Sequence, residues 1–144
     1  MNLESAVRSL RRYARALTLS QRVADHLLAQ TLRSAMGRPR SGNDVRIELF
    51  RIFHEVWKGE QATFLDSEGA VLVDRRLSRL DRHDRAALLL TCMEQFSLPV
   101  AAGAILSQPQ SAVRAARERA LQQATWWPEI EPALQLLRRP LAAA

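Results

Sequence analysis

The most restrictive feature of this 144-residue sequence is a helical period of apolar residues that returns in segment after segment. Apolar residues recur three and four positions apart, and no segment shows a convincing alternation typical of a strand. The three clearest N-terminal segments are residues 3–17, 21–36 and 44–58, and two more cover residues 70–80 and 82–95. The pattern predicts an all-α protein.

Residues that start or stop helices lie at the boundaries of these segments. Ser20 and Asp81 each carry a side-chain oxygen that can accept a hydrogen bond from a first-turn amide. Asn43 or Asp44 can do the same for the third helix. Gly37 is expected to end the second helix in a left-handed conformation, which glycine adopts without strain.

The helices divide into two small lobes. The first predicted lobe covers residues 1–59 and the second covers residues 70–125. The polar segment 60–69 has little periodicity and is the predicted linker between the lobes. Residues 126–144 are predicted to be a tail or a short final helix.

The second lobe contains a pattern typical of DNA-binding domains. Ser97 can cap a short apolar helix at residues 99–106, and a turn at residues 107–110 leads into an arginine-bearing helix at residues 111–124. With the helix at residues 82–95 as support, this order predicts a helix-turn-helix.

The net charge of +6 is confined to the first part of the chain. Residues 1–58 hold eleven basic and five acidic side chains, whereas residues 59–144 hold ten of each. Arginine makes bidentate contacts with carboxylates and phosphates, so the excess indicates an acidic partner or a nucleic acid. Solvated helix faces explain the same charge equally well.

No pattern in the sequence indicates catalysis. His26, His54 and His83 are far apart and lack neighbours at metal-ligand spacing, and the five glycines form no phosphate loop. Cys92 lies in an apolar helix, where a structural thiol is expected. We therefore expect no enzyme, no metal and no cofactor. The single cysteine and the absence of an apolar run of about 20 residues predict a cytoplasmic protein that does not cross a membrane.

Several motifs resemble bacterial extracytoplasmic-function sigma factors, and resemble more closely the sigma-like half of PhyR-type general stress regulators. The similarity extends over residues 8–121 and implies two lobes like sigma regions 2 and 4. The motifs are Leu10-Arg11-Arg12-Tyr13-Ala14-Arg15-Ala16-Leu17-Thr18, Leu49-Phe50-Arg51-Ile52-Phe53, residues 85–90, Glu94-Gln95-Phe96-Ser97 and Ala101-Ala102.

The resemblance also places candidate binding residues. In sigma factors, the stretch aligned with residues 24–30 grips the RNA polymerase clamp, so it implies polymerase contacts at Asp25, Leu28 and Gln30. His26 and Ala29 replace two of the usual polar groups, so this surface is altered.

Two groups of arginines complete the candidate site residues. The basic face of the first helix is expected to dock a partner, and it consists of Arg8, Arg11, Arg12 and Arg15. Arginines of the last helix could contact DNA phosphates, and these are Arg114, Arg117 and Arg119. The hydroxyl–arginine pairing of sigma factors is missing there, so we do not expect autonomous promoter recognition.

Three functions fit these observations. The first, which we favour, is a sigma-like transcription activator that binds core RNA polymerase together with a separate promoter-binding protein, similar to the gene transfer agent activators GafZ and GafA. The second is a sigma mimic that sequesters an anti-sigma factor. It is less favoured because PhyR proteins append a receiver domain and none follows here. The third is a DNA-binding protein that uses its helix-turn-helix alone.

Overall fold

The computed structural model describes residues 2–38, 44–60, 75–129 and 131–132, and these residues form helices and turns without a strand. The all-α prediction is confirmed. In chain order the elements are α1 (Leu3–Thr18), α2 (Gln21–Met36), α3 (Val45–Glu60), the 3₁₀-helix η1 (Arg75–Arg79), α4 (Arg82–Leu88), the wide π-type turns η2 (Leu89–Met93) and η3 (Val100–Leu106), and α5 (Gln110–Gln123).

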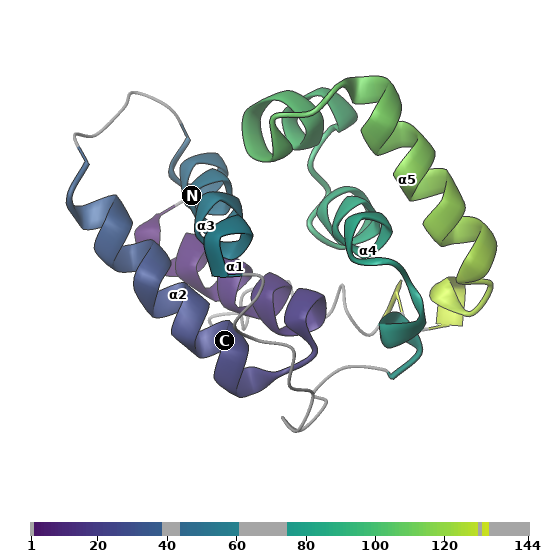
Figure 1. Ribbon diagram of the computed structural model, residues 1–144, viewed down its shortest axis with the longest axis horizontal. Coiled ribbons are helices and arrows are strands. Elements are labelled where there is room, and N and C mark those ends of the chain that lie inside the picture. Colours follow the sequence, from purple (N-terminus) through teal and green to yellow (C-terminus); the bar gives the residue numbers. More distant parts are fainter. Residues whose placement is uncertain (1, 39–43, 61–74, 130, 133–144) are drawn as a thin grey trace, which may run out of the picture.

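Helices α1, α2 and α3 pack against one another as the first lobe (Figure 1). Tyr13 of α1 lies between Phe50 and Phe53 of α3, with ring centroids 5.1 and 5.9 Å away. The predicted caps are present, because Ser20 accepts from the Val23 amide and Asp44 accepts from first-turn amides of α3. Local sequence signals therefore set the starts of α2 and α3.

The second lobe contains α4, η2, η3 and α5 (Figure 1). Asp81 caps α4 by accepting from the His83 amide, and Ser97 accepts from the Val100 amide before η3. Helix α5 packs on α4 and η3. The helix-turn-helix predicted in this lobe, and contact with DNA through it, both stay predictions.

The left-handed conformation predicted for Gly37 is wrong. Gly37 ends α2 with φ −82° and ψ −1°, in the right-handed region. The positive φ angles among the described residues belong instead to Leu19, Gln95 and Ser107. The second helix thus ends at the predicted place through a turn that does not require glycine.

The helix predicted over residues 82–95 differs in its second half. After α4 the turns widen in η2, and the amides of Glu94 and Phe96 donate to the carbonyls of Leu89 and Leu90. The chain then reverses at Gln95, which has φ 60°. Glu94 is the last residue before this reversal.

Parts of three predicted segments lie outside the described residues: most of the linker at 60–69, the first half of the helix at 70–80, and the tail beyond residue 132. Helix α3 runs one residue past Gly59 to Glu60. Residues 75–79 form a 3₁₀-helix where an α-helix was predicted, although Leu77 and Leu80 are buried as expected.

Both lobes contribute to one hydrophobic core. Buried residues from α1 through Trp127 form a single cluster, and η3 packs against α3 across the lobes. The rings of Phe50 in the first lobe and Phe96 in the second are 5.0 Å apart at an edge-to-face angle. None of the helices in the described ranges combines the length and apolar character needed to span a bilayer.

Candidate functional site

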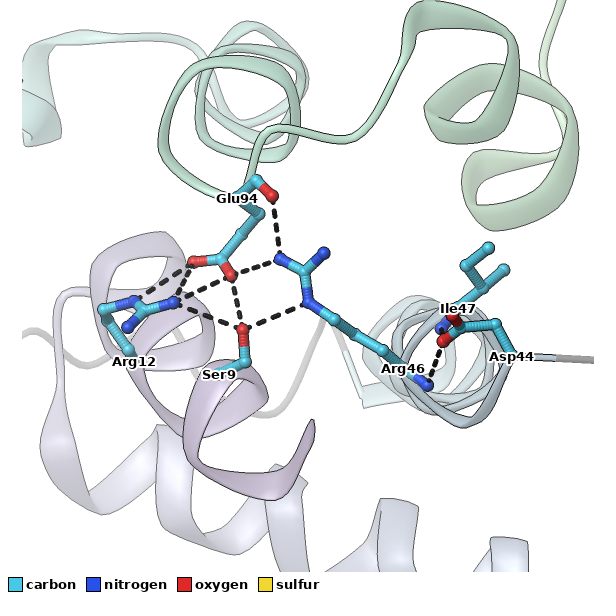
Figure 2. Close-up of polar contacts among 6 residues, drawn as sticks. All are labelled: Ser9, Arg12, Asp44, Arg46, Ile47 and Glu94. Atoms are coloured by element: carbon cyan, nitrogen blue, oxygen red, sulfur yellow. Dashed lines mark hydrogen bonds and ion pairs between the residues drawn. The ribbon is translucent and has the colours of Figure 1, made fainter. Parts of the chain in front are cut away.

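A buried carboxylate joins the two lobes. The Glu94 side chain has no exposed surface, and it projects from the end of η2 toward α1 and α3 (Figure 2). On α1, the Ser9 hydroxyl donates to Glu94 Oε1 at 2.6 Å. Arg12 donates to both Glu94 oxygens, with distances between 3.0 and 3.2 Å. One carboxylate therefore binds two residues that precede it by more than eighty positions.

Arg46 of α3 completes this network (Figure 2). Its guanidinium donates to Glu94 Oε1 and to the Glu94 carbonyl oxygen, both at 2.8 Å. It also lies over the Phe96 ring at 4.0 Å from the centroid. The side chains of Arg12 and Arg46 are only 13% and 10% exposed, so two cations and one anion meet with little water around them.

Two further arginines of α4 bridge the lobes. Arg85 donates to the carbonyl of Leu17 at the end of α1, where helix carbonyls lack partners. Burial lowers the pKa of Arg85 from its usual value, although the group stays a cation. Arg82 lies over the Trp57 ring of α3 at 4.5 Å. Arginine side chains thus make polar contacts between the lobes at Glu94 and at Leu17.

His54 is buried beside these contacts. Its Nε2 shares a 2.8 Å hydrogen bond with the Tyr13 hydroxyl. Desolvation by burial lowers the pKa of His54 to about 3, with nearby Lys58 and His83 acting in the same direction. Burial also raises the pKa of Tyr13 well above its usual value. Both side chains are therefore neutral at physiological pH and hold α1 to α3.

A small cavity between the lobes cannot hold a metabolite. Its volume is about 30 Å³, and its lining includes His54, Trp57, His83 and Leu106. Such a volume accommodates about one water molecule. Among the described residues, no group of His, Cys, Asp and Glu side chains is arranged to hold a metal ion.

The predicted basic face is divided by the fold. Arg8 and Arg11 are exposed on α1, and Arg8 pairs with Glu4. Arg15 is partly exposed and lies 3.4 Å from Asp25. Arg12 instead lies within the Glu94 network. The docking role of this face stays a prediction, and Arg8 and Arg11 are its most accessible members.

The residues predicted to contact polymerase differ in exposure. Asp25 is exposed on α2, Gln30 is half-buried, and Leu28 is only 4% exposed in the core of the first lobe. On α5, Arg114 is exposed and Arg117 is half-buried. Arg119 pairs with the buried carboxylate of Asp84 at 3.0 Å. Their contacts with polymerase or DNA stay predictions.

Arg46 and Ser9 were not among the predicted site residues. A signal for Arg46 exists in the sequence, because it precedes Phe50 and Phe53 by four and seven positions and therefore lies on the buried stripe of α3. A charged residue on such a stripe requires a buried partner. Nothing local in the sequence identifies that partner as Glu94.

Comparison with known proteins identifies relatives of this chain. Residues 3–54 match the family described as the Sigma2 domain of PhyR. The phyllosphere-induced regulator PhyR of Methylorubrum extorquens is 36% identical over 126 residues, which cover 81% of this chain. The chain spans 47% of that protein's length.

Solved structures of related proteins have a similar fold. A chain of the NMR structure of the PhyRSL–NepR complex from Sphingomonas sp. Fr1 is 32% identical, with a TM-score of 0.65 and coverage of 100% of this chain and 96% of that one. The sigma factor RpoE in complex with the anti-sigma factor NepR, from Bartonella quintana, shares the fold at 18% identity, with a TM-score of 0.73 and coverage of 89% and 94%. The fold has the two lobes, and one relative matches this chain over its whole length at 32% identity. This chain therefore belongs to the family of sigma-like domains of PhyR-type regulators.

Proposed function

We propose that this chain is a sigma mimic that binds an anti-sigma factor of the NepR kind. The observation that carries the proposal is the relative that matches this chain over its whole length at 32% identity, because that relative is a PhyR domain in complex with NepR. The favoured expectation from the sequence, an activator that binds RNA polymerase, has less support. That relative is named for its complex with NepR and not for polymerase binding.

The arrangement of the lobes is compatible with this proposal. A sigma factor on polymerase holds its two lobes apart, whereas a mimic or an inhibited sigma factor packs them together. Here a buried ion network and a shared core hold the lobes together. A closed molecule presents surfaces of both lobes to one guest. The exposed Arg8 and Arg11 suit an acidic partner, since the excess positive charge lies in the first lobe.

The experiment is a titration of the purified chain against a purified NepR-type anti-sigma protein. We expect a 1:1 complex by calorimetry and by light scattering after gel filtration. The chain should also restore transcription by a sigma factor that the anti-sigma protein inhibits. If the chain binds core polymerase and does not bind the anti-sigma protein, the proposed function is wrong and the activator is favoured.

Matched arginine variants locate the contact. Arg8→Ala with Arg11→Ala should weaken the complex and reduce its dependence on salt, because both side chains are exposed on the basic lobe. Arg114→Ala with Arg117→Ala removes the same charge from α5. It should leave anti-sigma binding near wild type unless α5 is part of the contact.

A further inference from the structure

The best-defined polar contact between the lobes is the triad of Arg12, Glu94 and Arg46 (Figure 2). We infer that this triad is a clasp that fixes the arrangement of the two lobes, and that the arrangement sets the affinity for the partner. The statement about affinity rests on the proposed function. The statement about the lobes does not.

The geometry of the clasp permits one arrangement. The Ser9 hydroxyl donates to Glu94 and accepts from Arg12 and Arg46, at 3.2 and 3.3 Å. Arg46 donates at once to the carboxylate and to the main-chain oxygen of Glu94, while its face lies on Phe96. A shift of η2 by one turn along α1 or α3 would break most of these contacts together. Directional contacts of this kind specify register better than apolar contact does.

Glu94 also balances charge in the closed molecule. Two guanidinium groups lie around it with little exposure, and a buried cation without a counter-ion is strongly unfavourable. If only the charge of Glu94 is removed, both guanidinium groups lose this buried ion pair while they stay little exposed in the closed arrangement. Separation of the lobes would increase their contact with water. Loss of this one carboxylate therefore favours opening.

The lobe arrangement affects binding by a population effect. A partner that contacts both lobes binds only molecules in which the two surfaces are correctly placed. Its apparent dissociation constant rises in inverse proportion to that fraction. If Glu94→Gln reduces the closed fraction to about a tenth, the affinity falls about tenfold.

The test measures the distance between the two lobes and, in a separate experiment, the affinity for the partner. Spin labels are attached at Met36→Cys on α2 and Leu121→Cys on α5, both exposed, in a chain that also carries Cys92→Ala. Pulsed electron paramagnetic resonance then gives the distance distribution between the lobes of the free chain. Calorimetry against a NepR-type anti-sigma protein gives the affinity.

Asp84→Asn is the matched control for Glu94→Gln. Asp84 is also a buried carboxylate paired with an arginine, but its partner Arg119 lies in the same lobe. We expect Glu94→Gln to lengthen and broaden the distance distribution and to weaken binding about tenfold, and Asp84→Asn to change neither. If Glu94→Gln does not fold, Arg12→Gln replaces it, because Arg46 still balances Glu94. A smaller shift in the same direction is then expected.

Three results would overturn the inference in whole or in part. A wild-type distance distribution in Glu94→Gln, or in its replacement Arg12→Gln, would refute the clasp. Lengthened distances with unchanged affinity would refute the link between arrangement and binding. If the wild-type chain binds no anti-sigma protein, the proposed function and the statement on affinity both fail, while the distances still decide the clasp.

Discussion

The charged residues of this molecule act mainly through where they are buried. Arg8 and Glu4 pair on an exposed face, where such a pair contributes little to stability. Glu94 forms the same type of ion pair in a site with little solvent exposure, where removal of one partner costs much more. An apolar replacement of the whole triad could be as stable. Its value to the molecule lies in specifying how the lobes meet.

At the scale of single residues, the buried His54 predicts that the free energy of unfolding depends on pH. The folded chain holds His54 neutral down to a pKa of about 3, whereas in the unfolded chain it takes up a proton near pH 6.5. Between these values the unfolded state binds more protons, so the free energy of unfolding falls as the pH is lowered. From pH 6.5 to pH 5 the loss due to His54 is about 2 kcal/mol.

Urea unfolding at several pH values measures this effect. His54→Gln lacks the titrating group, so its stability should vary less between pH 6.5 and 5 than that of the wild type. Parallel curves for wild type and His54→Gln would contradict the prediction.

At the scale of single elements, the starts of helices are the most predictable features. Ser20, Asp81 and Ser97 cap helices as expected because a cap depends on three or four neighbouring residues. The prediction for Gly37 fails for a related reason: glycine permits a left-handed turn without requiring one.

Features that depend on distant contacts were not predictable from the sequence. The widened turns of η2 and η3 follow no local signal, and the helix expected over residues 82–95 ends in a reversal at Gln95. Glu94, next to that reversal, contacts Arg46, which lies 48 positions earlier in the chain. The family resemblance predicted the two lobes, but it did not predict this contact between them.

The cap of α2 gives a prediction at this scale. Ser20 is buried, and its hydroxyl accepts from the Val23 amide at 3.2 Å. Ser20→Ala leaves that amide without its partner and should lower the free energy of unfolding by about 1 kcal/mol. Ser20→Thr retains the acceptor and should lose less. Urea unfolding of both variants checks the difference, and equal losses would attribute the effect to packing instead of the cap.

At the scale of the whole molecule, the shared core predicts that the two lobes unfold together. Phe96 lies where they meet, with Phe50 at 5.0 Å and the Arg46 guanidinium at 4.0 Å. Phe96→Ala should reduce global stability by about 3 kcal/mol or more, because it leaves a cavity and removes support from the buried arginine.

Hydrogen exchange of individual amides separates joint from independent unfolding. The most protected amides of α2 and of α5 lie in different lobes, so each reports the opening of its own lobe. If the lobes form one cooperative unit, Phe96→Ala lowers the opening free energies of both sets by the same amount. Leu121→Ala, at an exposed position of α5, should lower neither by more than about 1 kcal/mol. A decrease confined to α5 would show that the lobes unfold separately, and that their contact orients them without making them one folding unit.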